Sequence, residues 1–252
     1  MRVPDPMHFE AHAEDYARAR PPYPDALWDD LRDLGMLTPG LRALDLGAGT
    51  GQATSRLLAA GLRVTAVEPG PQLAAQIRTS FPEAPVIVSR AEDLSLPAGS
   101  FDLAVAATSI HWMDLDVVLP KVRRLLSPSG VLLVWRNVFG DPDFRTPFRD
   151  RIVQIVAERT APPRPGPDAQ DCVATAAALT ETGLFRVVDT FTYRWSIDLD
   201  EHEVRALFTT FSDWSLDEVG RAADAVRELG GTVLEHYSSW LIVLRPTVAA
   251  TA

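Results

Sequence analysis

A glycine-rich turn between a strand and a helix places the strongest constraint on how this chain can fold. Residues 41–46 form a short apolar segment, residues 44–52 read LDLGAGTGQ, and residues 53–60 have the apolar spacing of a helix. Glycine lets the backbone turn sharply and approach a ligand closely, because a Cβ atom would block both. The segment therefore predicts a cofactor site at the carboxyl end of a buried strand.

The spacing of the three glycines separates two classes of cofactor. Gly47, Gly49 and Gly51 give G-x-G-x-G, whereas a dinucleotide fingerprint is G-x-G-x-x-G, and its third glycine would fall on Gln52. Asp45 stands just before the first glycine, and a carboxylate suits an amine-bearing ligand better than a pyrophosphate. The pattern favours such a ligand, with a dinucleotide as the alternative.

The whole chain alternates between strand and helix patterns, which predicts an α/β fold with a mostly parallel, seven-stranded sheet and helices on both faces. We expect strands at residues 41–46, 63–67, 84–89, 101–106, 131–135, 185–197 and 232–244. We expect helices at residues 25–34, 53–60, 71–80, 117–126, 169–182, 201–211 and 216–229. A turn at residues 127–130 and an exposed Pro-rich loop at residues 161–167 complete the prediction.

The absence of internal repeats and low-complexity segments predicts a single domain over residues 1–252, with a helical cap inserted into it. We assign residues 1–36 to an N-terminal lid and residues 37–136 to a cofactor-binding core. Residues 137–182 and 199–230 would form the cap and substrate elements. Residues 183–198 and 231–245 would form the last two strands.

Composition narrows the range of partners and locations. The net charge of −10 disfavours a nucleic-acid partner. The chain lacks an apolar run of the ~20 residues that a membrane-spanning helix needs, and no basic-then-apolar leader opens it. Cys172 is the single cysteine, which fits a reducing compartment. We therefore expect a cytoplasmic protein without a membrane partner, acting as a monomer or homodimer.

An acidic residue ends the second expected strand. Glu68, followed by Pro69, is placed to accept hydrogen bonds from the hydroxyls of a ribose. Nucleotide-containing cofactors of both classes carry a ribose, so Glu68 supports the site without choosing between the classes.

The segment from Asp45 to Gly51 resembles motif I of the class I S-adenosylmethionine-dependent methyltransferases. The resemblance implies a Rossmann-like fold whose final strand is inserted antiparallel. It implies S-adenosylmethionine as the cofactor and S-adenosylhomocysteine as the product. The turn, including Ala48, would wrap the methionine moiety, and Asp45 would approach its amino group.

The same resemblance assigns residues to the adenine of the cofactor. Pro69 would flank the ring. Ala91 and Glu92 follow the third expected strand and would contact the adenine directly, while Asp93 would either contact it or cap a turn.

The N-terminal residues carry a more specific pattern. Residues 9–24 read F-x-x-x-A-x-x-Y-x-x-x-R-P-x-Y-P, which resembles the leader of a bacterial, methyltransferase type 11-like branch that acts mostly on small molecules. The resemblance implies that Tyr16 and Arg20 lie near the methionine carboxylate, which a guanidinium matches well. The alternative is a leader that packs on the sheet.

Residues after the fourth expected strand should lie beside the transferable methyl group, because ligands of open α/β sheets bind beyond the carboxyl ends of the strands. Ala107 and Thr108 are candidate cofactor contacts, and Trp112 is a candidate wall of the cofactor pocket. His111 is the candidate catalytic base, with a packing role as the alternative. An Asn/Asp-Pro-Pro-aromatic motif is absent here, which disfavours methylation of base or glutamine amino groups.

The expected cap is rich in aromatic side chains, which suggests a small, apolar or aromatic acceptor. The candidate lining residues are Trp135, Asn137, Val138, Phe139, Phe144, Phe148, Phe208, Phe211 and Trp214. No cluster of Cys, His, Asp and Glu has metal-ligand spacing, so we expect no metal. We predict methyl transfer to an O, N or C atom, achieved mainly by positioning. The alternatives are a cyclase or rearrangement enzyme that retains the cofactor and a non-catalytic cofactor-binding module.

Overall fold

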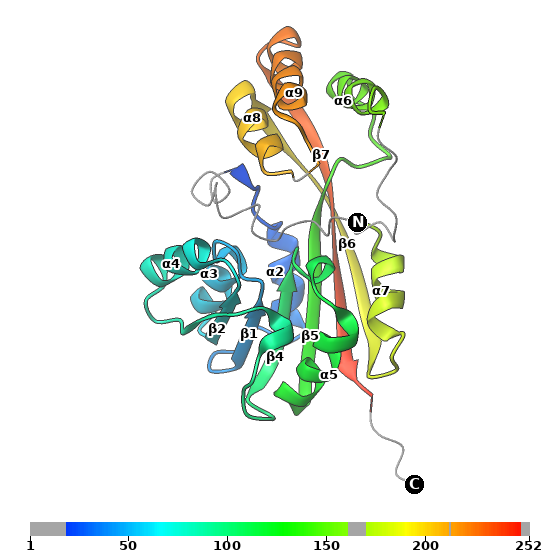
Figure 1. The fold of residues 1–252 in the computed structure, drawn as a ribbon. Coiled ribbons are helices and arrows are strands. Elements are labelled where there is room, and N and C mark those ends of the chain that lie inside the picture. Colours follow the sequence, from blue (N-terminus) through cyan, green and yellow to red (C-terminus); the bar gives the residue numbers. More distant parts are fainter. Residues whose placement is uncertain (1–18, 161–169, 212, 248–252) are drawn as a thin grey trace. The chain divides into compact units, whose positions relative to one another are not determined.

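The computed structural model describes residues 19–160, 170–211 and 213–247, and these divide into two compact units (Figure 1). Unit 1 comprises Met1–Tyr23, Asn137–Gly166 and Tyr193–Ser239. Unit 2 comprises Pro24–Arg136, Pro167–Thr192 and Trp240–Ala252. The chain changes unit five times, and three of these changes, after residues 136, 192 and 239, fall within long strands. The single-domain assignment of residues 1–252 stays a prediction.

Seven strands form one sheet in the order β3-β2-β1-β4-β5-β7-β6, which confirms the predicted α/β class. Their bounds are β1 Arg42–Leu46, β2 Arg63–Glu68, β3 Val86–Val88, β4 Phe101–Ala107, β5 Leu126–Phe139, β6 Phe185–Asp200 and β7 Thr232–Pro246. Four strand pairs, β1–β2, β2–β3, β1–β4 and β4–β5, are parallel. The arrow of β7 in Figure 1 points opposite to that of β4, as the resemblance implies.

The register of the parallel strands brings their carboxyl ends to one edge of unit 2. Leu46 at the end of β1 pairs with Val67, and Glu68 at the end of β2 pairs with Val88. Ala107 at the end of β4 pairs with Trp135. The strands form here because their apolar residues are buried between helices, and β1 is buried over all but its first residue.

The helices of unit 2 are α2 Asp25–Asp33, α3 Gln52–Ala59, α4 Pro71–Ser80, α5 Leu115–Leu125 and α7 Cys172–Thr180, with the short turns η2 Ala91–Asp93 and η3 Ile110–Trp112. Helices α3 and α4 contact β1, β2 and β3. Crossovers between parallel strands are right-handed, and the strand order reverses between β1 and β4. Helix α5 therefore covers the face opposite to α3 and α4, as predicted.

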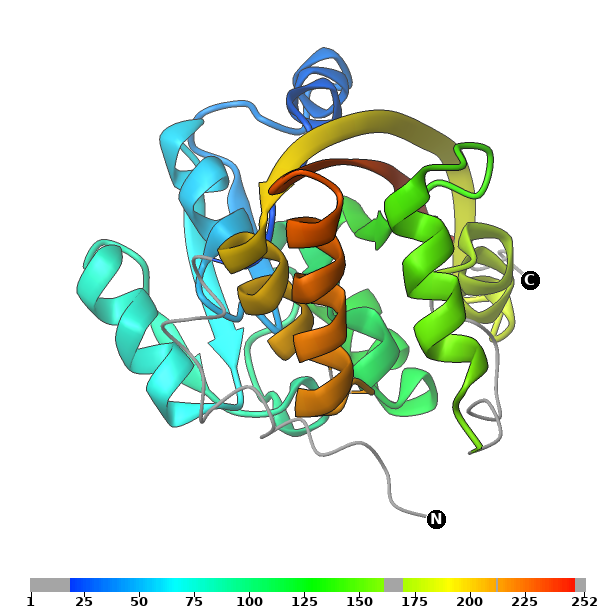
Figure 2. The same ribbon diagram turned by 90° about the horizontal axis from the view of Figure 1, so that it is seen from above.

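Unit 1 contains helices α6 Pro147–Ala157, α8 Glu201–Thr209 and α9 Leu216–Glu228. Helix α9 packs against both α8 and α6 (Figure 2). Their buried apolar side chains form a core with the end of β6 and the start of β7. Core residues include Phe148, Leu207, Phe208, Val226 and Tyr237.

Residues 127–130, expected as a turn, lie within the bounds of β5. Between Phe101 and Leu103 of β4, the partner position on β5 moves from Leu126 to Val131, so the residues between them loop out of the ladder. A Cβ atom at Gly130 would lie 2.9 Å from the Cβ of Leu126, so the chain does turn back here, inside the strand. The Pro-rich loop at residues 161–167 and the expected start of the helix at residue 169 lie outside the described residues.

Candidate functional site

The glycine turn leaves β1 with all three glycines in the left-handed region of backbone space. Their φ angles are +66° at Gly47, +59° at Gly49 and +84° at Gly51. The N–H groups of Gly47 and Ala48 donate to the carbonyl oxygen of Val67, at 2.8 and 3.0 Å, so the turn is held against β2. Side chains are rarely accommodated at such φ values, which explains why the sequence repeats glycine here.

The surroundings of the three glycines differ. A Cβ atom at Gly47 would lie 2.7 Å from the Cβ of Ser109, and one at Gly51 would lie 2.7 Å from the ring of Phe81. A Cβ atom at Gly49 would meet no atom of the described residues within 4 Å. Gly47 and Gly51 are therefore required by packing, whereas the backbone of Gly49 faces open space that a ligand can approach.

Glu68 ties the turn to the end of β2. Its Oε2 atom accepts a hydrogen bond from the N–H of Gly49 at 2.8 Å, and its Oε1 atom accepts one from the N–H of Gly70 at 2.9 Å. The residue is 5% exposed. A carboxylate beside the glycine turn, at the end of β2, is of the chemical type that accepts hydrogen bonds from ligand hydroxyls.

Asp45 is fully buried beneath the same turn. Its Oδ2 atom accepts a hydrogen bond from the Thr54 hydroxyl at 2.7 Å, and its Oδ1 atom has no hydrogen-bond partner among the residues that the structure describes. Burial raises the pKa of Asp45 to about 6; the charge of Glu68 adds to this, and the bond from Thr54 opposes it. A buried acceptor without a donor is costly unless a ligand satisfies it.

The segment after β4 is fixed against β1. Thr108 has a positive φ of 57°, and its N–H donates to the carbonyl oxygen of Trp135 at 2.8 Å. The hydroxyl of Ser109, which is buried, donates to the carbonyl oxygen of Leu46 at 2.6 Å. Strained backbone of this kind persists where neighbouring structure enforces it, often at functional sites. Ala107 and Thr108 thus lie at the same edge as the turn.

His111, the candidate base, is exposed and contacts Arg136. The Nη1 atom of Arg136 lies 2.8 Å from its Nδ1 atom and 3.3 Å from its Nε2 atom. The ring of Trp112 lies 4.9 Å from the imidazole, centroid to centroid. A guanidinium can only donate hydrogen bonds, so in this contact it competes for the lone pair that a general base would need.

The expected adenine-contacting residues belong to η2 and to the end of β2. Glu92 accepts a hydrogen bond from the N–H of Asp114 at 2.9 Å and is paired with Arg90 at 3.2 Å. Burial alone would raise its pKa, but the bonds from Asp114 and Arg90 outweigh it and lower the pKa. Asp93 is exposed, while Ala91 is buried and Pro69 is half-buried. Glu92 therefore anchors the segment after η3, a link that the sequence did not reveal.

The leader residues are placed in part. Tyr16 lies outside the described residues. Arg20 belongs to unit 1, where its Nη2 atom donates to the carbonyl oxygen of Thr210 at 3.1 Å and its guanidinium lies 4.8 Å from the ring centre of Phe211. The expected contact of Arg20 with a methionine carboxylate stays a prediction.

The expected acceptor-lining residues divide between the two units. Trp135 is fully buried in unit 2, where its ring meets that of Trp28 edge-on at 5.6 Å, so it is a core residue there. In unit 1, Phe148 and Phe208 are core residues, and Phe144 is exposed and stacks on His236. The partly buried aromatic residues that pack on this core are Phe139, Trp195, Phe211 and Trp214.

Sequence reasoning missed two polar residues of the site. Thr54 holds Asp45, and Ser109 holds the end of β1. The position of Thr54 in the first turn of the helix that follows the glycines was a usable signal, because helix starts favour hydroxyl groups. No sequence signal separates Ser109 from its neighbours, since its role depends on the pairing of β1 with β4.

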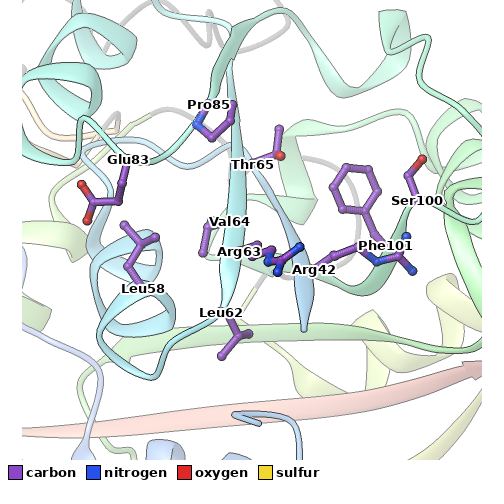
Figure 3. Close-up of a pocket in the computed structure, with 10 residues that line it drawn as sticks. All are labelled: Arg42, Leu58, Leu62, Arg63, Val64, Thr65, Glu83, Pro85, Ser100 and Phe101. Atoms are coloured by element: carbon purple, nitrogen blue, oxygen red, sulfur yellow. The ribbon is translucent and has the colours of Figure 1, made fainter. Parts of the chain in front are cut away.

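A hollow of about 510 Å³ lies at the opposite, amino edge of the parallel strands (Figure 3). Its lining includes Arg42, Arg63, Glu83 and Ser100. Arg42 is paired with Asp102 at 2.8 Å. This hollow contains none of the expected site residues, and ligands of parallel sheets bind at the carboxyl edge, so we do not assign it to the site.

Two further searches concern metals and membranes. Across residues 19–160, 170–211 and 213–247, no group of three or more His, Cys, Asp and Glu side chains could hold a metal ion. The helices of the same residues include none with the length and apolar character needed to cross a membrane.

Comparison with known proteins links this geometry to methyltransferases. A family model described as a methyltransferase domain matches residues 44–134. Over 132 residues the chain is 40% identical to an uncharacterized methyltransferase of Mycobacterium tuberculosis, in a match that covers 52% of this chain and 53% of the relative. The chain thus spans about half the length of the curated relatives that it matches.

Solved structures extend the similarity over most of the chain. A protein of Anaeromyxobacter dehalogenans assigned as a type II methyltransferase is 26% identical, with a TM-score of 0.62, covering 89% of this chain and 97% of that one. A phosphoethanolamine N-methyltransferase of Haemonchus contortus, solved with phosphomonomethylethanolamine and S-adenosylhomocysteine, is 15% identical with a TM-score of 0.57; the match covers 98% of this chain and 61% of that one. The second likeness concerns the fold alone.

Proposed function

We propose that this chain, which carries a class I S-adenosylmethionine-dependent methyltransferase domain, binds S-adenosylmethionine at the carboxyl edge of its sheet and transfers the methyl group to a small molecule. The observation that carries the proposal is the buried Oδ1 atom of Asp45, which lacks a donor among the described residues and lies beneath a turn whose middle glycine is open. Residues 44–134, which match the family, include this site.

The residues present fit the cofactor. Asp45 would accept a hydrogen bond from its ammonium group, and the carboxylate of Glu68 would accept from its ribose hydroxyls. The open backbone at Gly49 would allow close approach of the methionine moiety. S-adenosylmethionine supplies a methyl group that its sulfonium already activates. The chain's own residues then need mainly to bind, orient and exclude water.

Positioning is the expected source of rate acceleration, and it contributes ~7–11 kcal/mol in favourable cases. His111 is engaged by Arg136, so we do not require it as a base. We propose a small, apolar or aromatic acceptor that binds among the aromatic side chains of unit 1, including Phe139, Phe211 and Trp214.

Calorimetric titration tests the cofactor assignment. We expect S-adenosylmethionine and S-adenosylhomocysteine to bind and NADH to give no heat. Asp45→Asn and Glu68→Gln should each weaken binding at least about tenfold, since each removes a hydrogen bond to a charged group. Glu83→Gln, an exposed carboxylate at the opposite edge of the sheet, is the matched control and should bind normally. Binding of NADH alone would refute the assignment.

A labelled methyl group tests the transfer. Appearance of the label in an acceptor, with equimolar S-adenosylhomocysteine, is the expected result. Turnover of an acceptor without S-adenosylhomocysteine would instead favour a cofactor-retaining rearrangement. His111→Ala should keep cofactor binding and most of the transfer rate; loss of transfer with intact binding would restore His111 as the base.

A further inference from the structure

One row of side chains on β7 points into the core of unit 1. Val233, Glu235, Tyr237 and Ser239 alternate with more exposed residues, and their exposed fractions are 7%, 0%, 2% and 0%. Positions two apart on a strand share a face and lie about 6.8 Å apart. Val233 and Tyr237 belong to the apolar core that α6, α8 and α9 complete, so the carboxylate between them lies in apolar surroundings.

Ser239 in this row is fully hydrogen-bonded. The indole N–H of Trp195 donates to its hydroxyl oxygen at 2.8 Å, and the hydroxyl donates to the Oδ1 atom of Asn137 at 2.7 Å. The side-chain amide of Asn137 donates in turn to the carbonyl oxygens of Pro21 and Pro22, both at 3.2 Å. Each partner is satisfied, which is the pattern of a structural hydrogen-bond network.

Glu235 and Tyr237 do not follow this pattern. Both carboxylate oxygens of Glu235 lack a hydrogen-bond partner among the described residues. The hydroxyl of Tyr237 also lacks one there. The nearest cation is Arg149, whose Nη1 atom lies 3.8 Å from the Oε1 atom of Glu235, beyond hydrogen-bond distance. Buried polar groups that lack protein partners destabilise a fold unless a bound water, ion or ligand satisfies them.

The pair offers complementary hydrogen-bonding groups. Burial raises the pKa of Glu235 to about 7, against the opposing charge of Arg149 and a smaller opposing interaction with the backbone N–H of His236, which does not meet hydrogen-bond geometry. Burial also holds the pKa of the Tyr237 phenol well above its usual range, so its O–H remains a donor at neutral pH. A carboxylate acceptor and a phenol donor side by side match a group that both donates and accepts, which is a hydroxyl.

The surroundings disfavour a cationic ligand. Arg149 lies over the ring of Phe139 at 4.9 Å, and Arg20 interacts electrostatically with Tyr237. Two guanidinium groups against one carboxylate leave a net positive field, which repels an ammonium group. The ring centres of Trp195 and Phe139 lie 4.6 and 5.5 Å from that of Tyr237, so the side chains around Tyr237 are aromatic.

We propose that Glu235 and Tyr237 form a specificity subsite in unit 1 that binds the uncharged hydroxyl group of a flat, aromatic ligand. The hydroxyl donates to the Glu235 carboxylate and accepts from the Tyr237 O–H, and the aromatic side chains contact the ring. The inference rests on the proposed function and names the acceptor class as hydroxyl-bearing aromatic molecules. Both groups are enclosed, so side chains of unit 1 must move to admit the ligand.

Two matched probes test the subsite by calorimetry in the presence of saturating S-adenosylhomocysteine. The wild-type protein should bind 2-naphthol at least about tenfold more tightly than 2-methoxynaphthalene, which cannot donate. Glu235→Leu should remove most of this preference, because only Glu235 accepts from the ligand hydroxyl. Tyr237→Phe should instead weaken both probes, since the ether oxygen also accepts from the Tyr237 O–H, and both variants should leave the affinity for S-adenosylhomocysteine unchanged. Equal affinities of the wild type for both probes, or no binding of 2-naphthol, would overturn the subsite.

Thermal unfolding separates a ligand site from a structural ion pair. Tyr237→Phe and Glu235→Leu should keep or raise the Tm, because they remove unsatisfied polar groups. Ser239→Ala is the control from the same face, and it should lower the Tm by leaving Trp195 and Asn137 without their partner. If the first two variants lower the Tm as much as the control does, the row is structural and the subsite is refuted. Failure of the wild type to bind S-adenosylhomocysteine would instead contradict the proposed function.

Discussion

At the scale of single residues, Gly47 and Gly49 share a left-handed backbone but differ in what surrounds them. Gly47→Ala should lower the free energy of unfolding by about 2 kcal/mol or more, because the backbone strain adds to a clash with Ser109. Gly49→Ala should cost only about 1 kcal/mol from backbone strain, but should weaken S-adenosylhomocysteine binding at least about tenfold. Urea unfolding and calorimetry on both variants measure the contrast. Normal binding by Gly49→Ala would contradict a ligand over this turn.

Asp45 predicts how cofactor affinity depends on pH. Its carboxylate is ionised only above its pKa of about 6, and the ammonium group of the ligand requires the ionised form. Affinity for S-adenosylhomocysteine should therefore be constant above about pH 7 and should fall about tenfold for each pH unit below about 6. Calorimetry between these limits measures it. Asp45→Asn should show weak binding with no such dependence, and a parallel fall in both proteins would assign the effect to another group.

Without ligand, the same residue affects stability in the opposite direction. Its pKa is higher in the folded protein than the ordinary value of 3.8, so the folded state binds more protons between these values. The contribution of Asp45 to the free energy of unfolding is greatest below about pH 4 and is lost as the pH rises through about 6. Asp45→Asn should therefore gain stability relative to the wild type as the pH rises across this window. Chemical unfolding at several pH values checks the sign.

At the scale of elements, two helices of unit 1, α8 and α9, begin with capping boxes. The side chain of Asp200 accepts from the N–H of Glu203, whose side chain accepts from the N–H of Asp200, and Ser215 and Glu218 repeat the arrangement on α9. Asp200→Ala should lower the free energy of unfolding by about 1 kcal/mol. Asp198→Ala, an exposed carboxylate two residues earlier in β6, is the control. Equal losses in urea unfolding would show that charge, and not capping, stabilises α8.

At the scale of the whole molecule, the fold predicts which edge of the sheet a ligand protects. Saturating S-adenosylhomocysteine should slow amide hydrogen exchange at residues 47–51, 68–70 and 108–114, at the carboxyl edge of unit 2. Exchange at residues 97–100 beside the hollow of Figure 3 should not change. Binding of ligand to the folded state alone also raises stability by about 2.7 kcal/mol at a concentration one hundred times Kd. Protection at the amino edge would place the cofactor in the hollow instead.

Local patterns were sufficient to predict much of this protein. Strand and helix periodicity predicted seven strands and their chain order. The glycine turn with Asp45 indicated a methyltransferase-like segment, and a methyltransferase family model matches residues 44–134. Both predictions depend on residues close together in sequence. The structure confirms the α/β class and places Asp45, the turn and Glu68 together. Their roles toward a cofactor stay predictions, as does that of His111.

Other features depended on contacts between distant segments, and only the tertiary structure decided them. The inclusion of the turn at residues 127–130 within β5 follows from the pairing of β5 with β4, and the placement of Ser109 follows from that of β4 with β1. Nothing in the sequence around Glu235 distinguishes it from an exposed charged residue of a strand. Packing of three helices on β7 removes it from water and leaves its oxygens unpartnered among the described residues. The sequence by itself thus determined the elements and the motif, whereas burial and unsatisfied hydrogen bonding arise only when remote side chains meet.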